Sequence, residues 1–187
     1  MRFFVIGTCA VALLLQGPQA PPPDQTPVFN AQNQLKRPSG YEEWVMVGAS
    51  TGLSYNPQIN AQPGAGPGMF HQVYLQPWAY RHFKQTGQFP EGAMFVLAFY
   101  ESVRDAAPAK QGYYPADPIA SFEVHVKHKG LSESGWGFYG FDEGQEQAGM
   151  VPATAACYSC HASEAKTDNV FTQFYPAMRA LLKRNER

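Results

Sequence analysis

The sequence predicts an α+β fold in which a mainly antiparallel β-sheet is flanked by helices. The strongest strand signal is residues 93–100 (AMFVLAFY), a continuous apolar run whose length and aromatic content are typical of a strand buried on both faces. Residues 121–129 alternate between apolar and polar side chains, which is the period of a half-buried strand. Residues 136–141 (WGFYGF) predict a third, aromatic strand, and apolar side chains then recur at helical spacing from 170 to 183.

The N-terminal region predicts a targeting segment followed by an arm. Residues 1–20 contain Arg2, an apolar run and a small-residue end, as in a secretory signal peptide, with cleavage expected near Ala20. The apolar run is too short to serve comfortably as a permanent membrane anchor. Residues 21–39 are rich in proline, glutamine and asparagine, which predicts a linker or flexible arm. We therefore expect one folded domain over residues 40–187.

The first half of this domain contains weaker signals. Residues 41–47 are typical of a short helical turn or a strand, whereas residues 48–68 are rich in Gly, Pro, Asn and Ser and predict a long loop. Residues 73–75 predict a strand. Residues 76–86 predict a helix, because a proline occupies its first turn and a glycine follows it directly.

The composition narrows the class of protein. The chain has 187 residues and a formal net charge of -1, without a basic stripe, so a nucleic acid is not an expected partner. Aromatic residues make up 14% of the chain, which suits a flat apolar cofactor but equally suits an ordinary core.

Residues 157–161 (CYSCH) form a C-x-x-C-H motif, the attachment sequence of c-type haem. In such a motif one helical turn presents both thiols to the haem vinyl groups, and the histidine offers an imidazole nitrogen to the iron. The alternatives are a disulfide, a thioredoxin-like redox pair or half of a zinc site. Zinc would need a second ligand pair, and no other C-x-x-C is present. The motif therefore predicts one covalently attached haem c.

Export of the chain fits this chemistry. Removal of the signal peptide would also remove Cys9, which leaves only Cys157 and Cys160, the two cysteines of the motif. In bacteria c-type haem is attached outside the cytoplasm, so we expect a periplasmic location.

Several further segments resemble one known family. They are EWVMVG at 43–48, HFKQTG at 82–87, WGFYGF at 136–141, and C-x-x-C-H followed by AKTDNVFTQFYP at 165–176. Over roughly residues 40–183 the chain resembles the cytochrome P-460 family, a group that includes the cytochromes c′-beta. The resemblance implies a mostly β fold, usually a homodimer, with one pentacoordinate c-type haem. Members oxidise hydroxylamine with nitric oxide and pass electrons to a soluble cytochrome, or bind nitric oxide and similar small ligands.

The family's functional residues can be carried over by position. Cys157 and Cys160 match the covalent attachment points, and His161 matches the proximal iron ligand. Hydroxylamine-oxidising members also cross-link a lysine to the haem, and the position that resembles it here is Leu97. An alkyl side chain has no nitrogen to form that bond, so the resemblance shifts toward the cytochrome c′-beta side.

Two further residues are candidate distal catalytic groups. Glu123 resembles a distal carboxylate of the oxidising members and would act as a proton relay, or else it is a solvent-facing strand residue beside His125 and Lys127. His71 lies near the position of a distal arginine and would be a hydrogen-bond donor, a proton shuttle or a sixth ligand, or else a structural histidine.

Apolar side chains could form the wall of a distal pocket, although the default meaning of such residues is core. The candidates for this wall are Phe70, Phe95, Leu97 and Phe99. The methionines that could offer a thioether as sixth ligand, or simply pack, are Met69, Met94, Met150 and Met178. Two functions therefore remain open: a periplasmic haem protein that binds nitric oxide or carries electrons, and a hydroxylamine or nitric oxide oxidoreductase.

Overall fold

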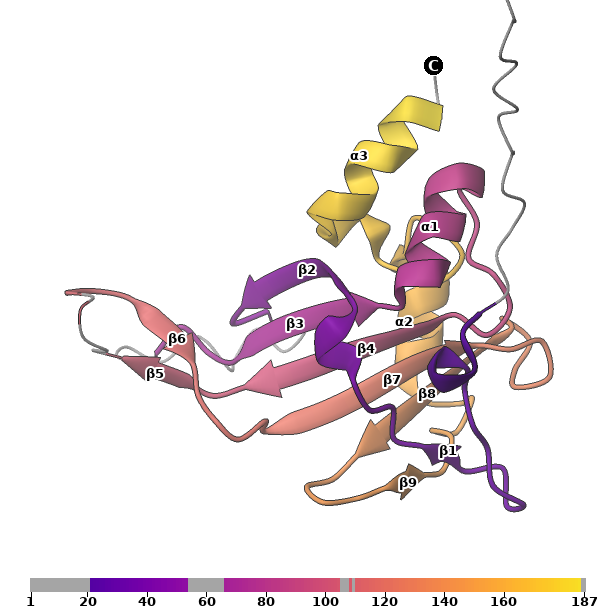
Figure 1. The fold of residues 1–187 in the computed structure, drawn as a ribbon, viewed down its shortest axis with the longest axis horizontal. Coiled ribbons are helices and arrows are strands. Elements are labelled where there is room, and N and C mark those ends of the chain that lie inside the picture. Colours follow the sequence, from indigo (N-terminus) through magenta and orange to yellow (C-terminus); the bar gives the residue numbers. More distant parts are fainter. Residues whose placement is uncertain (1–20, 54–65, 105–107, 109, 186–187) are drawn as a thin grey trace, which may run out of the picture.

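The computed structural model describes residues 21–53, 66–104, 108 and 110–185. Its centre is a five-stranded sheet in which every neighbouring pair of strands is antiparallel (Figure 1). The predicted α+β class is therefore confirmed. In spatial order, the strands are β2 (Val45–Thr51), β3 (Phe70–Leu75), β4 (Met94–Tyr100), β7 (Ser121–Lys127) and β8 (Trp136–Phe141).

Three α-helices and several short elements surround the sheet. Figure 1 shows α1 and α3 near one another beside the β2 edge, while the β5–β6 hairpin extends away from the sheet. The helices are α1 (Pro77–Thr86), α2 (Ala156–Glu164) and α3 (Pro176–Asn185). The 3-10 turns are η1 (Pro23–Gln25), η2 (Tyr41–Glu43) and η3 (Thr172–Phe174). The two small sheets pair β1 (Leu35–Lys36) with β9 (Gln147–Ala148), and β5 (Ser102–Arg104) with β6 (Tyr113–Pro115).

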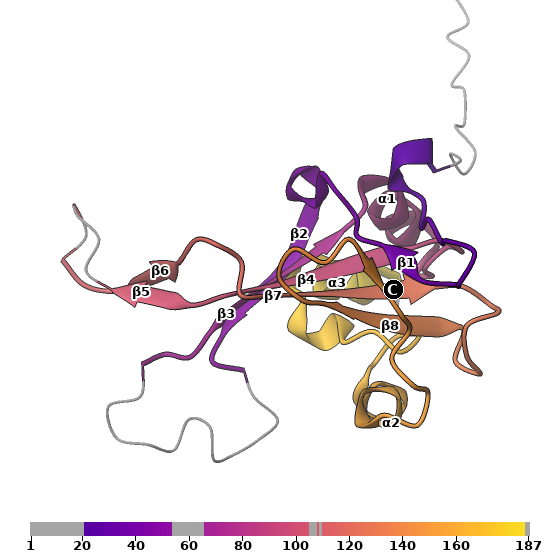
Figure 2. The same cartoon turned by 90° about the horizontal axis from the view of Figure 1, so that it is seen from below.

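The two faces of the sheet bury different clusters of side chains, because successive strand residues point to opposite faces. On one face, Val96, Phe122 and Tyr139 pack with Leu35 and Tyr41 from the N-terminal segment. On the other face, a second cluster joins strand residues to α1 and to α3. Its main members are Val73, Leu75, Phe83, Phe95, Trp136 and Met178. Viewed from below, α2 and α3 lie on the same side of the sheet (Figure 2).

Helix α1 begins and ends as its sequence predicts. Pro77 occupies its first turn, and Gly87 ends it with a left-handed backbone (φ 73°) while its N–H donates to the carbonyl of Phe83 at 2.8 Å. Just before the helix, the fully buried Gln76 accepts a hydrogen bond from the backbone N–H of Met94. This side chain therefore ties the start of α1 to the central strand.

The structure corrects three of the expected boundaries. Residues 21–39 are not a loose arm along their whole length, since Leu35 is 0% exposed and its strand pairs with β9. Residues 48–51 are not loop but the end of β2, because pairing with β3 through Thr51 and Phe70 outweighs weak strand propensity. The last helix begins at Pro176 rather than at 170, with η3 before it.

The expected signal peptide (1–20) and most of the expected loop lie outside the described residues. Within the described part of the chain, no helix is both long enough and apolar enough to span a membrane.

Candidate functional site

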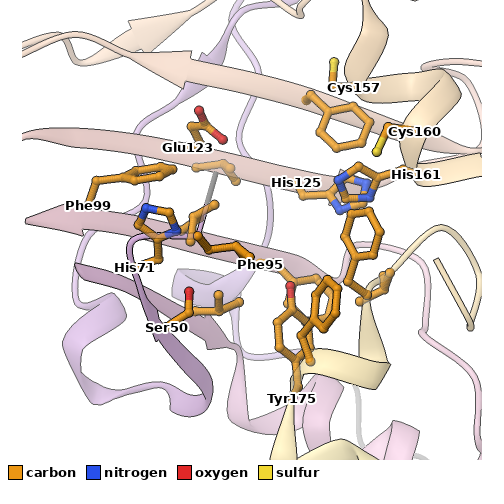
Figure 3. A pocket seen from close by; sticks show the side chains of 18 of the residues that line it. Ser50, His71, Phe95, Phe99, Glu123, His125, Cys157, Cys160, His161 and Tyr175 are labelled. Carbon is orange, nitrogen blue, oxygen red and sulfur yellow. The ribbon is translucent and has the colours of Figure 1, made fainter. Parts of the chain in front are cut away.

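A large cavity lies on the face of the sheet that α2 covers. Its volume is about 1090 Å³, and its wall is mainly apolar. Strands β3, β4 and β7 supply one side of the wall, while α2 and the segment from Val170 to Arg179 supply the other. Figure 3 shows Cys157, Cys160 and His161 at one end of the cavity and His71 and Phe99 along the sheet.

The whole C-x-x-C-H motif lies within α2. Its members are separated by three and four positions, which places Cys157, Cys160 and His161 on one face of the helix, and all three line the cavity. Both cysteines are free and half-buried, so the pair is not a disulfide. Burial raises the pKa of the Cys157 thiol. Two free thiols on the face of a helix that borders a large apolar cavity are the arrangement that thioether attachment requires.

The ring of His161 is fixed in one tautomer. Its Nδ1 lies 2.6 Å from the carbonyl oxygen of Asn169, and because a carbonyl only accepts, Nδ1 must donate. The lone pair is therefore on Nε2, the nitrogen that a metal can take. Burial lowers the pKa of His161, which favours the neutral, ligating form. Aromatic neighbours hold the ring: Phe171 at 4.4 Å and Phe138 at 4.7 Å between centroids.

The sheet wall brings together most of the expected distal residues. Leu97 on β4 pairs across the ladder with Glu123 on β7, and His71 on β3 pairs with Phe99. All four of these residues and Phe95 line the cavity. Their side chains share one face because each strand contributes alternate residues in register.

A sequence model of the cytochrome P-460 family matches residues 38–172, which spans the five-stranded sheet, α2 and the Asn169 carbonyl. The chain belongs to the cytochrome P-460 family. Comparison with curated protein sequences found no match. Membership in this family supports a haem c cytochrome.

One of the residues predicted for the distal wall does not line the cavity. Phe70 is not among the residues that line the cavity, because it precedes His71 on the same strand and so points to the opposite face. Met69 lines the cavity instead, while Met94 and Met178 are fully packed in the two cores and Met150 packs against the first.

Desolvation shifts the pKa values of the two candidate distal groups in opposite directions. Glu123 is open to the cavity, and the surrounding protein raises the pKa of its carboxyl group through desolvation. Desolvation lowers the pKa of His71, whose ring also packs edge-on against Phe99 at 4.6 Å. The neutral forms of both groups are therefore favoured relative to free side chains.

His125 is a site residue that the sequence patterns did not single out. It is 9% exposed, stacks on Phe138 at 4.1 Å, and meets the His161 ring edge-on at 5.0 Å. Burial lowers the pKa of His125 well below its ordinary value, and His161 and Lys127 act in the same direction. Its Nε2 is buried and has no hydrogen-bond partner among the described residues. The sequence feature that could have identified His125 is its position two residues after Glu123, which places both on the same face of β7.

Two residues of the C-terminal segment complete the wall. Tyr175 packs against Gly48, where an added Cβ would lie only 2.6 Å from the Tyr175 ring. Arg179 is the one lysine or arginine among the described residues that line the cavity.

These residues fit a haem. The cavity is slightly larger than the usual range for ligand sites, about 300–1000 Å³, and its apolar wall suits a porphyrin face. Cys157, Cys160 and His161 would attach and ligate it, and the Arg179 guanidinium offers a counter-charge for its carboxylates. Within the described residues, no three His, Cys, Asp or Glu side chains cluster as a protein-only metal site.

Proposed function

We propose that this chain is an exported, mono-haem c-type cytochrome that binds nitric oxide or a similar small ligand, with or without electron transfer. Cys157 and Cys160 hold the haem covalently and His161 is its proximal ligand. When bound, the haem supplies an iron that takes small ligands and changes oxidation state. The protein's part is to fix the proximal imidazole, shape access to the other face and exclude water.

The observation that carries this proposal is the side chain at position 97. Leu97 lines the cavity in the middle of the β4 wall, between Phe95 and Phe99. An alkyl group there cannot form the lysine–haem bond of the oxidising members, and it adds to an apolar wall that disfavours water and charged ligands. The site is therefore better suited to a neutral diatomic ligand than to hydroxylamine turnover.

The test is an absorption spectrum of the purified protein with and without nitric oxide. We expect thioether-linked haem, a pentacoordinate high-spin ferrous form, and a spectral change when nitric oxide is added. A low-spin spectrum in both oxidation states, unchanged by added ligand and by His71→Ala, would contradict the proposal. Replacing Cys157 and Cys160 together by serine should leave any haem extractable by acid solvent, which checks the covalent attachment separately.

Glu123 is the observation that favours a second function, oxidation of hydroxylamine. Such an oxidation releases protons as well as electrons, and Glu123 is a carboxyl group in the cavity wall opposite Leu97. As carboxylate it would accept a proton while a soluble cytochrome takes the electrons. The assay is steady-state hydroxylamine consumption with an artificial electron acceptor, comparing wild type, Glu123→Gln and a control, Glu133→Gln, in the β7–β8 connection. Turnover no faster than that of free haem excludes this function.

Location and assembly follow from the same proposal. We expect the mature protein in the bacterial periplasm because residues 1–20 read as a signal peptide, and we expect a homodimer because the family resemblance implies one. Cell fractionation with a haem stain and sedimentation of the purified holoprotein test the two statements.

A further inference from the structure

The proximal histidine depends on a carbonyl that lies in an unusual turn. The N–H of Val170 donates to the carbonyl of Thr167 at 2.8 Å, which closes a four-residue turn. The two central residues, Asp168 and Asn169, have positive φ angles of 47° and 58°. Two successive left-handed residues are the pattern of a type I′ turn, and Asp and Asn are the non-glycine residues that tolerate it best. The carbonyl that accepts from His161 Nδ1 belongs to this turn, at Asn169.

The Asp168 carboxylate ties the turn to the sheet. Its Oδ1 accepts a hydrogen bond from Trp136 Nε1 at 3.2 Å, and its Oδ2 pairs with the Lys127 ammonium. The Lys127 ammonium also lies 5.3 Å from the centre of the Trp136 ring, so each of the three side chains contacts the other two. Trp136 is 0% exposed and belongs to the core, which makes the sheet side of this connection rigid.

We propose that Asp168 is a positioning residue for the proximal ligand: by anchoring the turn to Trp136 and Lys127, it holds the Asn169 carbonyl against His161 Nδ1. This inference rests on the proposed haem attachment. A carbonyl held at hydrogen-bond distance increases the electron density of the imidazole and so strengthens its bond to iron. A stronger donor also favours the ferric state, which lowers the reduction potential.

The test compares Asp168→Ala with Asp142→Ala, which removes an exposed aspartate in the turn after β8. Both variants are prepared as holoprotein, and haem content is measured first. In Asp168→Ala we expect the iron–histidine stretching band of the ferrous protein to move to lower wavenumber and the reduction potential to rise. Asp168→Asn keeps an oxygen acceptor for Trp136 and should fall between wild type and alanine. Asp142→Ala should match wild type in both measurements.

A merely structural role would change stability without changing these two measurements. Asp168→Ala that carries full haem with a wild-type band and potential would overturn the inference, as would an equal change in Asp142→Ala. If Asp168→Ala does not accumulate, Lys127→Met tests the inference instead, because it removes the ion pair while keeping a side chain of similar length. It should shift the stretching band and the reduction potential in the directions expected for Asp168→Ala. A wild-type protein without thioether-linked haem would refute the proposed function itself, and this is seen before any variant is compared.

Discussion

Gly48 controls how closely the C-terminal segment approaches the sheet, and a single methyl group tests this. An ideal Cβ at Gly48 would lie 2.6 Å from Tyr175 Cδ1, whereas ordinary contacts begin at 3.4 Å. Gly48→Ala must therefore move the ring or the strand by about 0.8 Å to restore an ordinary contact. Overpacking of this kind costs about 1–3 kcal/mol. Tyr175 lines the cavity, so the same displacement changes the ligand site.

Gly140 provides the matched control. It also lies in the sheet and lines the cavity, yet a Cβ built there meets nothing within 4 Å. Replacing a strand glycine by alanine without a clash stabilises by about 0.5–1 kcal/mol, so the two variants should change stability in opposite directions. The assay is urea unfolding of the holoprotein, with carbon monoxide rebinding after flash photolysis as the site readout.

A double-mutant cycle isolates the contact. In a Tyr175→Ala background the ring is absent, so Gly48→Ala should no longer destabilise. Gly48→Ala that behaves like Gly140→Ala while Tyr175 is present would refute the reasoning, because the close approach of strand and ring would then not exist.

Three further predictions concern the arm, the pH dependence and the ligand pocket. Leu35→Ala should destabilise the fold by about 2–5 kcal/mol in urea unfolding because Leu35 is fully buried, whereas Val28→Ala, at a half-exposed position, should stay within about 0.5 kcal/mol; equal effects would mean that the arm is not part of the core. The folded-state pKa of Glu123 is raised, so its contribution to stability is present below its unfolded-state pKa and is lost as pH rises through the folded-state value. Glu123→Gln should therefore flatten the fall in stability over that pH range, and parallel wild-type and variant curves would contradict the desolvation of this carboxyl group. Phe99→Ala should increase the rate of carbon monoxide association by opening the wall, while Phe70→Ala, on the opposite face, should not; the reverse order would mean that the cavity face of β3 and β4 is misassigned.

The local sequence was sufficient for β4, β7 and β8 and for the helical face of the attachment motif. Period-two alternation correctly placed Glu123 opposite to Phe122, and the motif spacing placed the thiols and His161 on one helical face. Phe70 was assigned wrongly for a local reason: the expected strand began at 73, so the alternation was not extended back to residues 70 and 71. Once β3 is known to begin at Phe70, its face follows from the same rule.

What the sequence did not predict are contacts between distant segments. The burial of His125 depends on Phe138 from β8 and on His161 from α2, neither of which a strand pattern contains. The end of β2 depends on its pairing with β3, and the anchoring of Leu35 depends on β9, more than 100 residues away. Such features are set by tertiary packing, which overrides local propensity.

The cavity is built from an irregular turn on the His161 side and from regular strands on the other side, and these two parts differ in how freely their side chains can be substituted. The proximal ligand depends on an irregular segment, where a left-handed pair and a side-chain anchor must both be kept for the Asn169 carbonyl to reach His161. The sheet wall has no such requirement, because a side chain at Leu97 or Glu123 projects from a ladder held by backbone hydrogen bonds. We therefore expect substitutions on the wall to change the ligand side of the proposed haem site with little effect on the His161 side. Under the proposed function we therefore expect Leu97, rather than any residue of the attachment motif, to be the position at which a substitution shifts the protein between ligand binding and oxidation.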